Sequence, residues 1–280
     1  MAGRPDGAGP HALLRPAGSL LRMMRLGQLF GRGRTRERDP RPRLKLDLSG
    51  TAVYAVGDVH GCLDELLALE RNIAEDASTL PVAKLILMLG DYVDRGPASA
   101  QVLDHLVAPP PPGFERICLA GNHEIAMLDY LDGRTSLQSW LRIGGEPTLL
   151  SYGIDHRRLL DLYRDERQID EAIRDAIPPD HVAFLRSLPV LVEAGRYVFV
   201  HAGIRPGVAL DRQTDTDLVF IRSAFFERAH LLTHYVVHGH TPIEEARRDG
   251  MRVNLDTGAF FTGRLTGLRI WQDKGRYLGN

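Results

Sequence analysis

Three apolar segments, each followed directly by a glycine and a polar residue, constrain the fold of this chain more than any other feature. They read AVYAVGD from residue 52, KLILMLGD from residue 84 and RICLAGN from residue 116. Residues 62–77 and 97–107 lie between them and carry apolar residues at helical spacing. Continuously apolar strands that alternate with helices predict a parallel sheet covered on both faces.

The second half of the chain contains further strand-like segments. They read VLVEAGRYVFVHAG, HYVVHGHT, MRVNLDTGAFF and LTGLRIWQ, and their short spacing and turn glycines predict a second, partly antiparallel sheet. Residues 132–188, between the two halves, are rich in charge and read as helical. We therefore predict an α/β fold: a four-layer α-β-β-α sandwich of two mixed sheets with a helical insertion at 132–188.

The N-terminal residues differ in composition from the rest. Residues 1–43 contain ten arginines and only three acidic residues, with many glycines and prolines. We predict a disordered arm there, followed by one domain over 44–280. Within the arm, 19–30 is an alternative candidate for a short basic amphipathic helix that contacts an anionic surface or a partner.

Composition excludes several classes of protein. The net charge of −1 is not that of a nucleic-acid-binding chain, and we expect no nucleic-acid partner. No apolar stretch approaches the roughly 20 residues that a membrane span needs. Two cysteines make a disulfide framework unexpected. We therefore expect a cytoplasmic protein.

Polar residues gather where five predicted strands end. They are Asp58 and His60; Asp91, Asp94 and Arg95; Asn122 and His123; His201; and His238 and His240. Ligands of open α/β sheets bind outside the carboxyl ends of the strands, so these side chains stand where a site would form. Aspartate, imidazole and amide oxygen suit manganese, iron or zinc better than calcium. A pair of such cations would neutralise carboxylates at the end of a buried strand.

The motifs GDVHG, GDYVDRG, GNHE, HAG and HGHT, in this order over about residues 51–271, resemble the phosphoprotein phosphatase family of binuclear metallophosphoesterases, in its compact bacterial serine/threonine branch. The resemblance implies two divalent ions, with manganese expected and iron or zinc as alternatives. It also implies their ligands: Asp58 and His60 for one ion, Asp91 as the bridge, and Asn122, His201 and His240 for the other.

The resemblance further implies how a phosphate ester would be cleaved. Water activated between the two ions attacks phosphorus directly, without a covalent phosphoenzyme. The phosphate is bound by Asn122, His123, Arg95 and Arg222. His123 protonates the leaving alkoxide, and Asp94 holds its ring.

For two of these assignments, other residues remain candidates. His238 and His240 share one face of a strand, so the period of the strand does not separate them, and only the GHT motif favours His240. Arg222 is the best match to an expected second arginine, but Arg205, Arg212 and Arg228 lie in the same stretch. Asp256 is interpreted as structural.

The predicted activity is dephosphorylation of phosphoserine and phosphothreonine in proteins or peptides, with phosphotyrosine as a further substrate. The alternative is a symmetrical dinucleoside tetraphosphatase or another nucleotide-polyphosphate hydrolase, and a minor alternative is a non-catalytic phospho-binding scaffold. Symmetrical tetraphosphatases have GDLVARG and GNHD where this chain has GDYVDRG and GNHE. The motifs of this chain therefore favour protein dephosphorylation. The stretch WLRIGGEPTLLSYG is expected to begin a helical cap beside the site.

Overall fold

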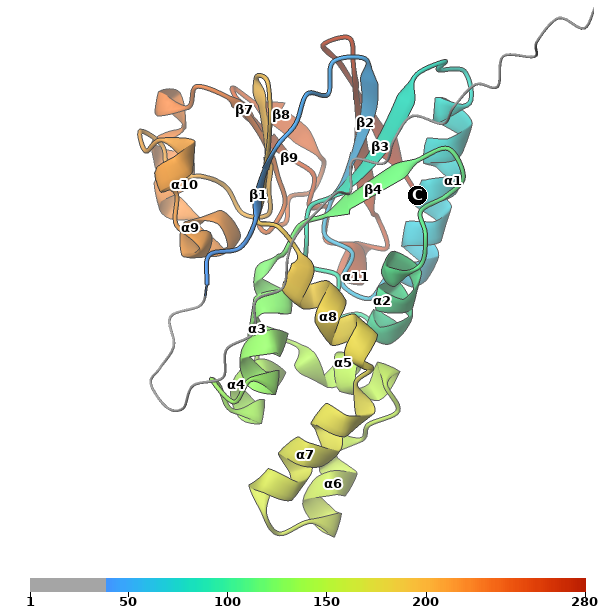
Figure 1. Ribbon diagram of the computed structural model, residues 1–280, viewed down its shortest axis with the longest axis vertical. Coiled ribbons are helices and arrows are strands. Elements are labelled where there is room, and N and C mark those ends of the chain that lie inside the picture. Colours follow the sequence, from blue (N-terminus) through green and yellow to red (C-terminus); the bar gives the residue numbers. More distant parts are fainter. Residues whose placement is uncertain (1–38) are drawn as a thin grey trace, which may run out of the picture. The chain divides into compact units, whose positions relative to one another are not determined.

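The computed structural model describes residues 39–280 (Figure 1). The predictions for residues 1–38, including the helix at 19–30 and its contact with an anionic surface, lie outside the described residues. Among the described helices, none is long and apolar enough to cross a membrane.

One sheet has five strands in the order β11-β10-β2-β3-β4. The predicted parallel strands form one side of it, with β4 at the edge: β2 (Thr51–Val56), β3 (Ala83–Met88) and β4 (Glu115–Cys118). They are joined by α1 (Leu63–Ala77) and α2 (Ser99–Val107). The edge formed by β10 (Thr266–Trp271) and β11 (Lys274–Gly279) is antiparallel.

The other sheet has six strands in the order β1-β5-β6-β7-β9-β8 and is mixed. Its strands are β1 (Arg43–Lys45), β5 (Leu191–Ala194), β6 (Tyr197–Val200), β7 (Tyr235–His238), β8 (Arg247–Asp249) and β9 (Arg252–Asn254). Its short helices are η1 (Leu210–Arg212), α9 (Asp215–Phe220), α10 (Ser223–Glu227) and η2 (Ala229–Leu231), and α11 (Ala259–Thr262) follows β9.

The segment LTGLRIWQ lies in a different sheet from the one predicted. It forms β10, which pairs antiparallel with β2 in the five-stranded sheet, with Gly267 opposite Val56 and Ile270 opposite Val53. The prediction was wrong because a local pattern shows that a segment is a strand but not which strand it pairs with. That choice depends on contacts with residues more than 200 positions away.

The start of the domain also differs from the prediction. Residues 40–43 were assigned to the arm, but Arg43 opens β1, which pairs with β5. The guanidinium of Arg41 donates to the carbonyls of Leu185 and Leu188 at 3.0 Å each. Arginine-rich composition suggested disorder, whereas these arginines have acceptors that only the folded chain supplies.

Burial along the strands shows the layers. On β2, Val53 and Ala55 pack into the core between the two sheets, while Tyr54 and Val56 pack with α1 residues such as Leu66. This alternation is the period of two expected of a strand buried on both faces. Figure 1 shows α1 and α2 on the outer side of the five-stranded sheet and α9 and α10 on the outer side of the other. The two mixed sheets and their helices confirm the predicted α/β sandwich.

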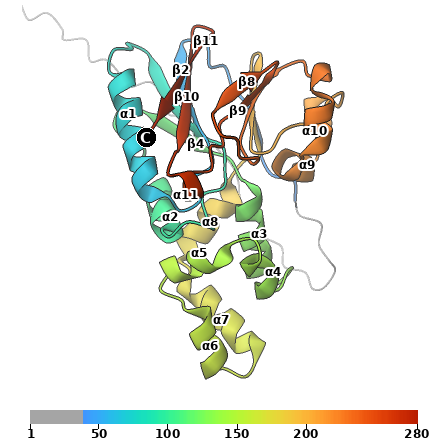
Figure 2. The same ribbon diagram turned by 180° about the vertical axis from the view of Figure 1, so that it is seen from behind.

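The stretch between Leu131 and Leu191 contains helices and turns only, in line with the expected insertion. After α3 (Asn122–Leu131) come α4 (Leu137–Leu141), α5 (Gly145–Ser151), α6 (His156–Leu162), α7 (Glu166–Ala176) and α8 (Pro179–Ser187). Seen from behind in Figure 2, α3, α4, α5 and α11 lie at the same end of the two sheets. At that end β2, β3, β6 and β7 finish.

Candidate metal centre

The loops at these strand ends adopt a backbone conformation that is costly for ordinary residues. His60, Asp91, Asp94, Arg95 and His240 all have positive φ, between 46° and 70°. Among the described residues other than glycine, only the two turn residues between β10 and β11 share this property. Such strain persists where the surrounding structure enforces it, and it is concentrated at functional sites.

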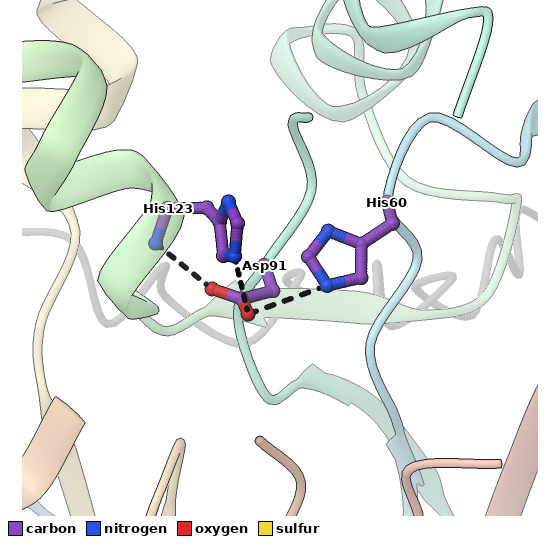
Figure 3. Close-up of side chains that lie close together, drawn as sticks. All are labelled: His60, Asp91 and His123. Atoms are coloured by element: carbon purple, nitrogen blue, oxygen red, sulfur yellow. Dashed lines mark hydrogen bonds and ion pairs between the residues drawn. The ribbon is translucent and has the colours of Figure 1, made fainter. Parts of the chain in front are cut away.

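The first cluster of candidate ligands consists of His60, Asp91 and His123 (Figure 3). The Oδ2 atom of Asp91 lies 3.5 Å from Nε2 of His60 and 3.9 Å from Nε2 of His123. Asp91 also accepts the backbone N–H of His123 through Oδ1 at 3.1 Å. All three side chains are buried. The sequence had predicted Asp58, in place of His123, beside His60.

The second cluster shares Asp91 and adds His201 and His240. Oδ2 of Asp91 lies 3.4 Å from Nε2 of His201, which in turn lies 3.2 Å from Nδ1 of His240. The side-chain oxygen of Asn122 lies 3.0 Å from Nε2 of His201 and 2.8 Å from Nδ1 of His240. Two clusters that share one carboxylate are consistent with a binuclear centre.

Backbone carbonyls fix the orientation of two of these histidines. Nδ1 of His60 lies 2.9 Å from the carbonyl oxygen of Val93, and Nδ1 of His201 lies 3.1 Å from that of Leu89. A carbonyl accepts only, so each Nδ1 carries the proton and each Nε2 presents its lone pair to Asp91. This arrangement is typical of histidines that bind metals.

Burial keeps the imidazoles of two candidate ligands neutral, the form that binds a cation. It lowers the pKa of His60 to about 3 and that of His240 to about 2. Burial would also raise the pKa of Asp91, but its interactions with His201 and His123 outweigh burial and hold that pKa well below its usual value. Asp91 is therefore a carboxylate.

Asp58 and Asp256 add negative charge to the same pocket. Burial, and then the charges of Asp256 and Asp91, raise the pKa of Asp58 well above its usual value. Asp58 accepts the backbone N–H of His240 at 3.0 Å, and a side chain on the neighbouring Gly239 would collide with its carboxylate. Asp256 accepts the N–H of Gly258 at 2.9 Å, which fits the structural role predicted for it. Buried carboxylates that raise one another's pKa favour a bound cation.

The donor set fits a pair of divalent cations. Carboxylate oxygens, imidazole nitrogens and an amide oxygen converge around Asp91 in the described part of the chain. When bound, two such ions supply a nucleophile from water at neutral pH and offset charge on the transferring phosphoryl group. The candidate ligands that lie together are His60, Asp91 and His123 in the first cluster and Asp91, His201 and His240 in the second, with the side-chain oxygen of Asn122 beside His201 and His240.

One member of the first cluster, His123, also forms a buried pair with a second carboxylate. Nδ1 of His123 lies 2.7 Å from Oδ2 of Asp94. Burial opposes protonation of His123, but the charges of Asp91 and Asp94 outweigh it and raise its pKa. The insertion holds Asp94 in turn: the indole N–H of Trp140 and the hydroxyl of Thr148 donate to its Oδ1 at 3.0 Å and 2.8 Å.

The two predicted arginines lie beside candidate metal ligands. Nη1 of Arg95 is 3.1 Å from Nε2 of His60. Arg222 donates to the carbonyl of His240 at 3.2 Å and to the hydroxyl of Thr241 at 3.3 Å. Its competitor Arg205 instead pairs with Asp217 at the surface.

The structure distinguishes His238 from His240, which the period of the strand had left as equal candidates for the last metal ligand. The ring of His238 packs against Phe225 and Phe226, with centroids 5.0 and 6.1 Å away, and burial lowers its pKa to about 4. It belongs to neither cluster. The structure thus brings His240, and not His238, to Asp91.

Glu124 is a buried residue whose role sequence reasoning missed. Its carboxylate accepts the backbone N–H groups of Gly121, Asp91 and Tyr92 at 2.7–2.8 Å. It therefore fixes the loop that carries Asp91. Its place as the third residue of α3, where a glutamate closes a capping box, was the available signal.

Comparison with known proteins agrees with this site. Residues 51–257 match the family described as calcineurin-like phosphoesterase, so the chain belongs to that family. The match covers every candidate ligand named above.

Among curated proteins, the chain is similar to the enzyme named "Bis(5'-nucleosyl)-tetraphosphatase PrpE [asymmetrical]" from Anoxybacillus flavithermus. The two are 26% identical over 234 residues, which cover 76% of this chain and 88% of the relative. The protein of that name from Bacillus subtilis is 25% identical over 237 residues, covering 77% and 89%.

Among solved structures, a candidate diadenosine tetraphosphatase superposes with a TM-score of 0.59 at 19% identity, covering 85% of this chain and 97% of its own. A point mutant of a cold-active protein tyrosine phosphatase gives 0.51 at 18% identity, covering 83% of each chain. At these identities the likeness concerns the fold alone.

Proposed function

We propose that this protein hydrolyses bis(5'-nucleosyl) tetraphosphates asymmetrically, into a nucleoside triphosphate and a nucleoside monophosphate. The observation that carries the proposal is the similarity to asymmetrical tetraphosphatases, which for the relative from Anoxybacillus flavithermus extends over 76% of this chain. It favours nucleotide hydrolysis over the protein dephosphorylation predicted first. It also favours asymmetrical over the symmetrical cleavage predicted as the alternative.

The proposed roles follow from the geometry of the site. Asp58, His60, Asp91, Asn122, His201 and His240 hold two divalent ions, with manganese as the proposed metal. Arg95 and Arg222 stand beside ligands of the two different clusters. Two guanidinium groups so placed suit a substrate with several negatively charged phosphates in a row.

The departing group needs little help in this reaction. A nucleoside triphosphate leaves as a stabilised phosphate anion, since the last proton of a phosphate monoester is lost near pH 6. Cleavage of the tetraphosphate therefore does not require a protonated side chain beside the departing oxygen.

Dephosphorylation of phosphoserine and phosphothreonine is the second candidate, and one observation favours it. His123 and Asp94 form a buried pair 2.7 Å apart, and the charges of Asp91 and Asp94 raise the pKa of His123. A serine or threonine alkoxide is a poor leaving group and needs the proton that such a pair provides.

One assay separates the candidates. The manganese-loaded protein is incubated with diadenosine tetraphosphate and, separately, with a phosphothreonine peptide, and the products are separated by chromatography. Release of ATP and AMP supports the proposal, whereas release of two ADP molecules would show symmetrical cleavage. Turnover of the peptide alone would replace the proposal by the second candidate. If neither is hydrolysed, the scaffold role gains support.

A further inference from the structure

Two exposed phenylalanines stand beside the metal centre on the short helix α11. Phe260 is 36% exposed and Phe261 is 62% exposed, the largest value among the exposed aromatic side chains of residues 39–280. Neither residue belongs to the motifs that define the ligands. Exposed aromatic rings beside a site of charged groups suggest a substrate with an apolar, planar part.

Phe260 connects the centre to the surface. Its ring meets that of His60 edge to face, with centroids 5.4 Å apart and an interplanar angle of 81°. The guanidinium carbon of Arg95 lies 5.0 Å from the ring centroid. Phe261 then packs against Phe260, with centroids 4.9 Å apart and an angle of 76°. The two rings thus extend from a candidate metal ligand and a phosphate-binding arginine out to solvent.

The short helix is held firmly in place. The carboxylate of Asp256 accepts the N–H of Gly258, whose φ of 67° starts the turn. The hydroxyl of Thr262 donates to the carbonyls of Thr257 and Gly258 at 2.8 and 2.9 Å. Because these bonds fix the backbone on both sides of the phenylalanines, the rings are positioned before any ligand arrives, which lowers the ordering cost of binding.

We propose that Phe261, supported by Phe260, is the stacking surface for the nucleobase next to the attacked phosphorus. This inference rests on the proposed function and extends it to base recognition. Every base has a π-face, so stacking on an aromatic ring tolerates different bases. No base-specific hydrogen bond is required.

The position of the rings agrees with asymmetrical cleavage. Arg95 contacts His60 on one side and Phe260 on the other. A substrate phosphate bound by Arg95 would therefore lie close to a base stacked on the phenylalanines. The outer phosphorus atoms, each of which is bonded to a ribose oxygen, are close enough to a base to fit this arrangement. The inner phosphorus atoms, which symmetrical cleavage requires, are one phosphate further from either base.

Binding of two simple probes tests the proposal independently of turnover. Isothermal titration calorimetry on the manganese-loaded protein compares AMP with inorganic phosphate. We expect the wild type to bind AMP more tightly, and Phe261→Ala to lose about tenfold in AMP affinity with little change for phosphate. Phe261→Trp should retain the preference. Tyr277→Ala, which removes a 43% exposed ring from β11, is the matched control and should change neither affinity.

Three outcomes overturn the inference. They are equal affinity of the wild type for AMP and phosphate, an equal loss of both in Phe261→Ala, and no loss of either. If Phe261→Ala instead weakens only a phosphothreonine peptide, the rings contact a peptide side chain and the nucleobase proposal is wrong. A protein that binds AMP through Phe261 but does not hydrolyse diadenosine tetraphosphate contradicts the proposed function, and only the assignment of Phe261 as a base-stacking surface then stands.

Discussion

At the scale of single residues, the site depends on which side chain receives which hydrogen bond. His60 and His201 each give Nδ1 to a backbone carbonyl, so Nε2 faces Asp91. His123 gives Nδ1 to Asp94 instead. The difference between a carbonyl and a carboxylate partner gives these similar rings different chemistry, because the negative charge of Asp94 stabilises a protonated ring.

Replacement of His123 by Asn is expected to reduce turnover more for substrates with a poor leaving group than for those with a good one. Turnover of a phosphothreonine peptide should fall by about 10²–10⁴-fold, because the alkoxide loses its proton donor. Turnover of diadenosine tetraphosphate or of p-nitrophenyl phosphate should fall much less. Steady-state kinetics on all three substrates measure this. An equal loss on all three would mean that His123 acts as a metal ligand, a role open to it as a member of the first cluster.

Replacement of Glu124 tests how much its hydrogen bonds to the backbone contribute to the stability of the fold. In Glu124→Gln the amide group of the new side chain would meet backbone N–H groups, such as those of Asp91 and Tyr92, that now have an acceptor. An unsatisfied buried donor costs about 1–3 kcal/mol. Urea unfolding should show that loss, with an unchanged m-value. Glu166→Gln, at an exposed position in α7, is the control and should unfold like the wild type.

At the scale of elements, the helical insertion supports the chemistry although it supplies none of the candidate ligands. Trp140 on α4 and Thr148 on α5 both donate to Asp94. The backbone N–H of Arg95 also donates to the carbonyl of Gly144, at 2.9 Å, between these two helices. The prediction that this stretch begins a cap beside the site agrees with these contacts, but its role in positioning Asp94 was not foreseen.

Thr148 allows a conservative test of that role. Thr148→Val keeps the shape but removes the hydroxyl that bonds Asp94, so Trp140 alone of these two donors remains and the orientation of His123 is less firmly fixed. We expect up to about a 100-fold loss in turnover of the phosphothreonine peptide. Thr148→Ser, which restores the hydroxyl, should recover most of it. A loss of the same size for p-nitrophenyl phosphate would indicate general disruption of the site and would argue against a positioning role.

At the scale of the whole molecule, the centre joins both sheets. Asp58, Asp91 and Asn122 follow strands of the five-stranded sheet, whereas His201 and His240 follow strands of the six-stranded one. Cations bound between them would therefore link the two sheets. They would also neutralise acids whose burial and mutual repulsion raise the pKa of Asp58.

Metal binding should consequently stabilise the fold. At a manganese concentration about 100 times the dissociation constant, the gain is about 2.7 kcal/mol for one site, which corresponds to a rise in Tm of roughly 5–10 °C for a domain of this size. Thermal unfolding with manganese and with a chelator measures it. Asp91→Asn should lose the shift and the bound metal, as judged by elemental analysis. Asp161→Asn, at an exposed position in α6, should keep both. Full metal content in Asp91→Asn would refute the bridging role.

The sequence alone determined the parallel strands of the five-stranded sheet, the order of the motifs and most of the candidate ligands. Glycine–polar ends on apolar strands are local features, and parallel strands bring their carboxyl ends to one edge. The tertiary structure decided what local pattern leaves open: β10 beside β2, His240 rather than His238 next to Asp91, and Phe261 beside the centre. Each of these depends on contacts between residues far apart in the chain, and neither periodicity nor motif specifies such partners.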